Sequence, residues 1–258
     1  MKILCTIPGK FGDLLWALPT VRELNKKEYI NGRHSVDEHG VHIGVMPQYE
    51  SLLPLLNVQP YIDKAFVIEN WTCTGSPHGD QPWEAPVPEG YDKVYHLGYR
   101  NHPNRNHPLI DFIAGQQGIQ LTKPIPFISV PSNINLLKPY VAYAFNESMM
   151  ELKDPFIQRV KEELNEVLFV DVSKLPWLNA ATMISNSMAF IGCRSANYVL
   201  SCGLGKKVFV YEPNTSRSIH GLWGTTFSCP YVDETEVNNV EVVKDEINKL
   251  LKGASTCV

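Results

Sequence analysis

The sequence predicts an α/β fold made of two domains, each built around a parallel sheet. Short apolar runs alternate with amphipathic helical stretches along the chain, and a proline-containing break divides this pattern into two halves. The expected domains cover residues 1–130 and 138–258. With 258 residues, the chain is long enough for each half to bury a core of its own.

The first domain opens with a strand, a glycine-containing turn and an amphipathic helix. The apolar run at 3–7 predicts the strand, Pro8, Gly9 and Gly12 predict the turn, and leucines recur at helical spacing beyond it. Asp13 is therefore expected at the mouth of the helix, beside the carboxyl end of the strand, where open parallel sheets bind ligands. Capping of the helix explains an aspartate at this position equally well. The turn lacks the GxGxxG and GxxxxGK[ST] patterns of common phosphate-binding loops.

The rest of the chain continues the alternation of strands and helices. In the first half we expect strands at 41–46, 65–68 and 93–97, and helices at 48–56 and 108–117. In the second half we expect strands at 140–145, 167–172, 190–191 and 208–211, and helices at 154–164, 178–187, 198–204 and 240–251. The linker is placed at 127–137, because the prolines around it stop regular elements. Such alternation implies parallel strands joined by right-handed crossovers.

The opening unit also carries a family resemblance. The run GKFGDLLWALPTVRELN resembles the N-terminal signature of the ADP-heptose:lipopolysaccharide heptosyltransferases, glycosyltransferase family 9. In that family a Gly-Asp pair follows the first strand and precedes a helix of the type LLxxxPxVRxLxK. The family's aspartate is the proposed general base for the acceptor hydroxyl, and the match falls on Asp13.

A second resemblance lies in the other half. The segment AFIGCRSANYVLSCGLGKKVFVYEPN, at 189–214, is similar to the family's nucleotide-sugar segment. Its loop at the start of a helix offers backbone amides, the Ser195 hydroxyl and the Arg194 guanidinium to a pyrophosphate. Where the family usually has Asp-Ser/Thr-Gly followed by a His, this chain has Arg194, Ser195 and Ala196 followed by Tyr198. This departure bears on the identity of the donor.

The resemblance implies a short, divergent family 9 member with two Rossmann-like domains facing a cleft, the GT-B-like arrangement. It implies metal-independent transfer of a sugar, a heptose in the family, from a nucleotide-diphosphate sugar to a hydroxyl acceptor such as a saccharide, with no cofactor. Asp13 would be the general base. The expected donor-binding residues are Asn146, Lys153, Arg194, Ser195, Ala196 and Glu212. The expected phosphate or acceptor loops contain Gly9, Gly12, Arg100, Arg217 and His220, although a structural role explains Arg217 and His220 equally well.

Composition narrows the class of protein further. The six cysteines are scattered without a C-x-x-C pair, which is typical of reduced thiols rather than disulfides or a zinc site. The N-terminus has no leader pattern and no run of 18 apolar residues occurs, so we expect a cytoplasmic protein without a membrane span. The net charge of −4 argues against a broad nucleic-acid-binding surface. No histidine pair at helical spacing points to a metal site.

Two other functions remain open at this stage. The chain could be a non-catalytic protein that binds a nucleotide or nucleotide sugar on the same scaffold. It could also be a virus-type glycosyltransferase that acts on modified bases of nucleic acid. The sequence specifies neither the donor sugar, the acceptor, the stereochemical outcome nor the oligomeric state.

Overall fold

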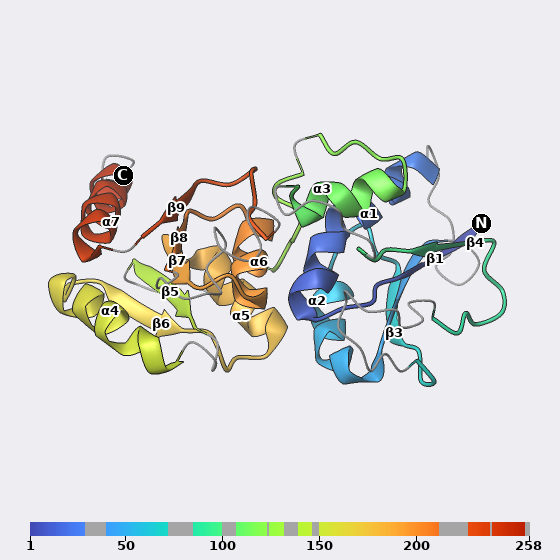
Figure 1. Ribbon diagram of the computed structural model, residues 1–258, viewed down its shortest axis with the longest axis horizontal. Coiled ribbons are helices and arrows are strands. Elements are labelled where there is room, and N and C mark those ends of the chain that lie inside the picture. The colour runs from blue at the N-terminus through green and yellow to red at the C-terminus, as the bar shows by residue number, and fades with distance from the viewer. Residues whose placement is uncertain are drawn as a thin grey trace.

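The structure of the protein, a computed structural model, contains two parallel sheets flanked by helices (Figure 1). It describes residues 1–28, 40–71, 85–99, 107–122, 124–131, 139–145, 150–211, 227–237 and 239–255. One sheet is formed by strands that precede residue 97, and the other by strands that follow residue 139. The α/β class expected from the sequence is confirmed.

The first sheet has the strand order β3-β2-β1-β4, with every neighbouring pair parallel. Its strands are β1 (Lys2–Thr6), β2 (Gly40–Val45), β3 (Lys64–Val67) and β4 (Lys93–His96). The helical elements of this half are α1 (Phe11–Glu28), η1 (Pro47–Leu52), α2 (Leu53–Leu56) and α3 (Leu109–Gln116). The helix expected at 48–56 is thus a 3₁₀ segment followed by one turn of α-helix.

The second sheet has the strand order β6-β5-β7-β8-β9 and is also parallel throughout. Its strands are β5 (Tyr140–Ala144), β6 (Leu168–Asp171), β7 (Ala189–Gly192), β8 (Val208–Val210) and β9 (Glu234–Glu236). Its helices are α4 (Met150–Glu163), α5 (Trp177–Asn186), α6 (Ala196–Gly203) and α7 (Val240–Ser255). The sequence did not predict β9, because this strand carries no apolar residue.

The two faces of the second sheet pack against different layers. Val141 and Ile191 lie in a core with α4 and α7, which cover the side away from the first half (Figure 1). Their neighbours Ala142 and Phe190 belong to a larger core, which includes α5, α6, α1 and the first sheet. This alternation follows from the two-residue period of side chains along a strand. One continuous apolar core therefore joins the two halves.

Ring contacts within this core join helices of the two halves. The Trp16 ring of α1 and the Tyr198 ring of α6 lie edge to face, with centroids 6.2 Å apart. Phe11 of α1 contacts Trp177 of α5, with centroids 4.8 Å apart. Such aromatic pairs add to the burial of apolar surface, so they hold α1 against the helices that cover the second sheet.

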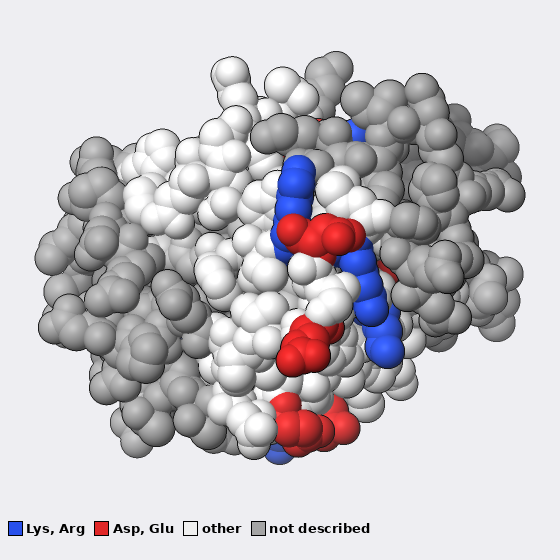
Figure 2. All heavy atoms as spheres, turned by 90° about the vertical axis from the view of Figure 1, so that its right-hand side faces the viewer, with Lys and Arg blue, Asp and Glu red and all other residues white. Residues whose placement is uncertain are grey.

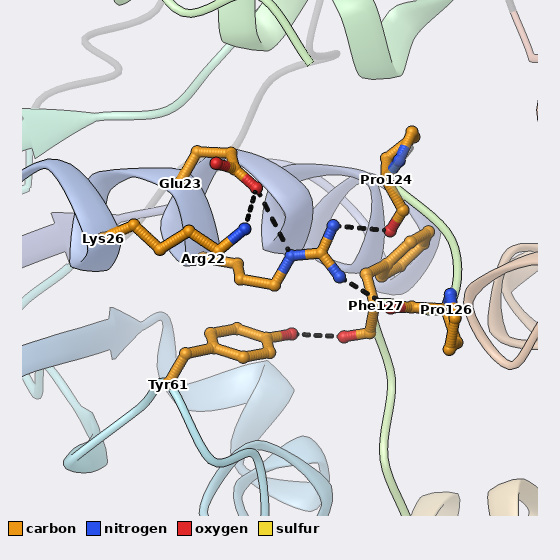
Figure 3. A network of polar contacts seen from close by, with 7 residues as sticks. All are labelled: Arg22, Glu23, Lys26, Tyr61, Pro124, Pro126 and Phe127. Atoms are coloured by element: carbon orange, nitrogen blue, oxygen red, sulfur yellow. Dashed lines mark hydrogen bonds and ion pairs between the residues drawn. The ribbon is translucent and has the colours of Figure 1, made fainter. Parts of the chain in front are cut away.

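The segment that leaves the first half is fastened by polar contacts (Figure 3). Arg22 of α1 donates to the carbonyl oxygens of Pro126 and Pro124, at 2.6 and 2.8 Å. The Tyr61 hydroxyl donates to the carbonyl of Phe127 at 2.5 Å. The amide of Phe127 in turn donates to the carbonyl of Gly203 in the second half, at 2.8 Å. Residues 132–138 lie outside the described residues, so the domain bounds 1–130 and 138–258 stay predictions.

The surface of the first half carries charges of both signs. On the face shown in Figure 2, the described Lys and Arg side chains lie next to Asp and Glu side chains. Within the described ranges, no helix is long and apolar enough to cross a membrane.

Candidate functional site

Each sheet reverses its strand order at one point, and these two points define where a ligand is expected. In the first sheet the reversal lies between β1 and β4, and in the second sheet between β5 and β7. Open α/β sheets bind ligands beyond the carboxyl ends of the strands at such switch points. Asp13 follows β1, while Arg194 and Ser195 follow β7. The topology therefore places both sequence motifs at switch points.

Asp13 is the third residue of α1, and its carboxylate reaches back to the residue before the helix. Its Oδ2 accepts hydrogen bonds from the backbone N–H of Lys10 at 2.8 Å and from the Tyr99 hydroxyl at 3.0 Å. The bond to Lys10 has the pattern of a capping box, in which a side chain of the first turn satisfies the amide that precedes the helix. Capping accounts for only one of the two bonds. No described residue donates a hydrogen bond to Oδ1.

Gly9 makes room for this carboxylate. Its φ is +122°, a conformation that side chains with a Cβ rarely adopt. A Cβ at Gly9 would lie 2.7 Å from Asp13 Cβ and 2.8 Å from Asp13 Oδ2. A larger residue at Gly9 would therefore displace the Asp13 side chain. The expected role of Gly9 in a phosphate or acceptor loop stays a prediction.

The environment of Asp13 makes it a stronger base than an ordinary aspartate. Burial raises the pKa of Asp13 to about 6, while the Lys10 amide, the Tyr99 hydroxyl and the Lys10 ammonium each oppose that rise. The residue is 8% exposed, so it is largely removed from water. A carboxylate with a pKa near 6 is mostly ionised at pH 7 and accepts a proton more readily than one with a pKa near 4.

Tyr99 is the residue of this site that sequence reasoning missed. It follows β4 by three positions, and β4 pairs with β1 in the sheet. Burial and the neighbouring Asp13 raise the pKa of Tyr99 well above its usual value, so its hydroxyl stays protonated and donates a hydrogen bond to the carboxylate. The ends of the same two strands are also joined by a hydrogen bond of 2.6 Å between Thr6 Oγ1 and His96 Nδ1. The missing signal was the strand order, because only that order brings residue 99 beside residue 13.

At the second switch point, the charge of Arg194 is balanced by the neighbouring strand. Its side chain is only 5% exposed, and Nη2 forms ion pairs with Glu234 and, at 2.9 Å, with Glu236 of β9. The Tyr198 hydroxyl donates to the other carboxylate oxygen of Glu234, at 2.5 Å. The guanidinium expected to meet a diphosphate is therefore held by two carboxylates in this structure.

Ser195 occupies the N-cap position of α6 but does not cap the helix with its side chain. Its backbone is extended, with φ of −135° and ψ of −177°, and its hydroxyl forms no capping hydrogen bond. Most N-cap serines use the hydroxyl to satisfy an amide of the first turn. The first amides of α6 and the Ser195 hydroxyl thus lie together without that bond.

The switch points of the two sheets lie close to each other. A Cβ at Gly12, in the first turn of α1, would lie 3.6 Å from Ala196 Cα and 3.6 Å from Val199 Cγ2 of α6. The N-terminal ends of α1 and α6 therefore contact each other. The structure thus brings the first turn of α1, which contains Asp13, next to Ala196 at the start of α6.

The remaining candidate residues are not placed. Asn146, Glu212, Arg100, Arg217 and His220 lie outside the described residues. Lys153 belongs to α4, but its side chain is likewise not described. Among the side chains that the structure describes, no group of three or more His, Cys, Asp or Glu could hold a metal ion.

Two parallel sheets with adjoining switch points define the class of the molecule: it has a GT-B-like fold of Rossmann type. Three solved glycosyltransferases share this fold. The glycosyl transferase family 9 protein of Veillonella parvula matches with a TM-score of 0.57 at 11% identity, over 97% of this chain and 89% of that one. The iron-containing dodecameric glycosyltransferase TibC of enterotoxigenic E. coli matches with a TM-score of 0.58 at 14% identity, over 98% and 76%. The ADP-heptose lps heptosyltransferase II of E. coli matches with a TM-score of 0.56 at 12% identity, over 99% and 100%.

No protein-family model and no curated protein sequence matches this chain. The similarity therefore rests on structure, and at these identities it establishes the fold. The fold is the one that the resemblance to glycosyltransferase family 9 implied, so that expectation is confirmed.

Proposed function

We propose that this protein is a glycosyltransferase that moves a sugar from a nucleotide-diphosphate sugar to a hydroxyl acceptor. The observation that carries the proposal is Asp13, a buried carboxylate with one oxygen that accepts no hydrogen bond from the described residues. It lies at a switch point that adjoins a helix N-terminus. The fold shared with family 9 enzymes supports it, and one of the similar structures carries ADP-heptose in its name. A nucleotide-diphosphate heptose is accordingly the first donor to test.

The proposed reaction uses the two switch points for different tasks. Oδ1 of Asp13 takes the proton of the acceptor hydroxyl while the acceptor oxygen forms a bond to the anomeric carbon of the donor sugar. The bond between that carbon and the diphosphate oxygen breaks, and the nucleoside diphosphate leaves with the electron pair. The amides at the start of α6, with Ser195, would stabilise the charge on the departing diphosphate.

Other residues keep the roles that the resemblance implied. Asn146 and Glu212 are proposed to bind the ribose or base of the donor, and Lys153 its phosphates. Arg100, Arg217 and His220 are proposed to line the acceptor or phosphate loops, beside Gly9 and Gly12. Arg194 is proposed to contribute a cation to the donor site, although two glutamates already contact it.

The test is release of nucleoside diphosphate from a panel of ADP-, UDP- and GDP-sugars, including ADP-heptose, with a saccharide acceptor. We expect acceptor-dependent release with at least one donor, and the same rate after treatment with EDTA. Release that requires an added metal would contradict the metal-independent mechanism. Tight donor binding without any release would favour a non-catalytic binding protein, and transfer only to hydroxymethylated DNA would favour the nucleic-acid alternative.

A further inference from the structure

The hydrogen bonds of Asp13 are distributed unequally between its two oxygens. Both bonds, from the Lys10 amide and the Tyr99 hydroxyl, end on Oδ2. Oδ1 accepts none from the described residues. Gly9 lies against the Oδ2 side, since its absent Cβ would be 2.8 Å from that oxygen. The carboxylate is therefore oriented by one oxygen and left with the other for chemistry.

We propose that Tyr99 is the positioning residue of Asp13: its hydroxyl keeps the carboxylate ionised and fixes Oδ2, so that Oδ1 is the oxygen that takes the acceptor's proton. This inference rests on the proposed function for its last step, but not for the first two. A hydrogen bond to the charged form of an acid favours that form. The backbone amide of Lys10 belongs to the turn itself and is present whatever residue stands at 99, whereas Tyr99 is a side chain from another strand end that a substitution can remove.

The other groups around Asp13 do not take over this role. The Lys10 ammonium acts on Asp13 through its charge, and Tyr49 of η1 interacts with Tyr99 rather than with the carboxylate. On α6, which packs against Gly12, the Tyr198 hydroxyl bonds Glu234. On α3, which packs against α1, Asp111 accepts a hydrogen bond from Tyr231 at 2.5 Å. Among the described side chains, Tyr99 is the one that donates to Asp13.

The decisive experiment is carbon-13 NMR titration of the Asp13 carboxyl in protein labelled at aspartate Cγ, with Asp13→Asn used to assign the signal. Wild-type protein should titrate near pH 6. In Tyr99→Phe, which keeps the ring and loses the hydroxyl, the midpoint should rise by about one pH unit, a tenfold gain in proton affinity. Tyr61→Phe is the matched control, because it removes another buried hydroxyl, bonded to Phe127, and should leave the Asp13 midpoint unchanged.

The outcomes separate this inference from the proposed function. An unchanged midpoint in Tyr99→Phe, or an equal rise in Tyr61→Phe, would overturn the role of Tyr99 whether or not the protein transfers a sugar. If transfer is found, the acid limb of kcat/KM should move by the same pH interval in Tyr99→Phe. Should Tyr99→Phe fail to fold, a difluorinated tyrosine at position 99 tests the same bond. This more acidic donor should lower the midpoint, and a midpoint that stays or rises would also overturn the inference.

Discussion

The two switch points of this molecule carry opposite charges and keep them in different states. At the edge of the first sheet, Asp13 is buried with one oxygen bonded twice and the other not bonded by any described residue. At the edge of the second sheet, the side chain of Arg194 is also buried, but Glu234 and Glu236 of β9 compensate its charge. Both sites follow a parallel strand and adjoin the start of a helix.

The difference shows how burial can serve two purposes. An acid that loses water more than nearby positive charge can offset, as Asp13 does, becomes a stronger base, which suits proton transfer. A cation that loses water but gains two carboxylates stays charged. Arg194 in this way holds β9 to the loop after β7, which is a structural role. Under the proposed function, the first edge would carry out proton transfer, and the helix amides at the second edge would attract the anionic donor.

The largest effect is expected from Asp13→Asn. Asparagine keeps an oxygen that can accept the bonds from Lys10 and Tyr99, but it cannot take a proton. Transfer should therefore fall by roughly 10² to 10⁴-fold, while donor affinity stays near that of the wild type. Steady-state kinetics and calorimetry measure the two quantities. Near-normal turnover in a folded mutant would assign Asp13 to capping alone and leave the catalytic base unidentified.

Arg194→Ala tests the structural role of the second edge. Removing one partner of a buried ion pair leaves Glu234 uncompensated, so we expect the free energy of unfolding to fall by about 3 kcal/mol. Chemical denaturation measures it, and Lys244→Ala, which breaks a surface pair with Glu163, should shift the midpoint far less. Unchanged stability combined with lost diphosphate binding would instead make Arg194 the donor-binding cation that the sequence suggested.

Much of the fold could be predicted because its signals are local. Apolar runs and helical spacing gave the strands and helices of both halves to within a few residues, including β5 and α6. The exception is β9, whose sequence Glu-Thr-Glu has no apolar pattern. Its glutamates are ordered by Arg194, a residue 40 positions away in sequence. An edge strand held by long-range ion pairs leaves no periodic signal in the chain.

The pH dependence of the free energy of unfolding tests whether Asp13, unlike Arg194, is buried without a compensating ion pair. Its pKa is about 6 in the folded protein against an ordinary 3.8, so folding favours the protonated form. Below about pH 3 both states are protonated, and Asp13 then has almost no effect on stability. As the pH rises from about 3 to 7, wild-type protein should lose about 3 kcal/mol of stability relative to Asp13→Asn. Urea denaturation of both proteins at several pH values measures this difference, and parallel curves would show that Asp13 is not desolvated.

Gly9→Ala should disturb the same edge through geometry. The new Cβ would meet Asp13 at 2.7 Å, in a backbone conformation with φ of +122°. We expect a loss of about 1–3 kcal/mol of stability together with reduced transfer, measured by denaturation and kinetics. Gly115→Ala in α3 is the control, since a Cβ there meets nothing within 4 Å and should stabilise the helix slightly. Equal effects of the two substitutions would deny Gly9 a special role.

The candidate site was only partly readable in the sequence. Asp13 and Ser195 could be found because each follows a strand and begins a helix, which is a local pattern. Tyr99 could not, because its contact with Asp13 depends on β4 lying beside β1. The ion pairs that compensate the charge of Arg194 could not be predicted for the same reason, since they require β9 to join the edge of the second sheet.

Ser195→Ala should give the smallest effect and the most specific one. The Ser195 hydroxyl makes no capping bond in α6, so its removal should leave the stability of the helix nearly unchanged. If this hydroxyl binds the donor, its loss removes one hydrogen bond to a charged diphosphate, worth about tenfold in affinity. Calorimetry with ADP, and with adenosine as the uncharged control, should show weaker diphosphate binding and unchanged nucleoside binding. Equal ADP affinity in the mutant and the wild type would move the diphosphate site away from the start of α6. The second switch point would then retain only the structural role that Arg194 and β9 give it.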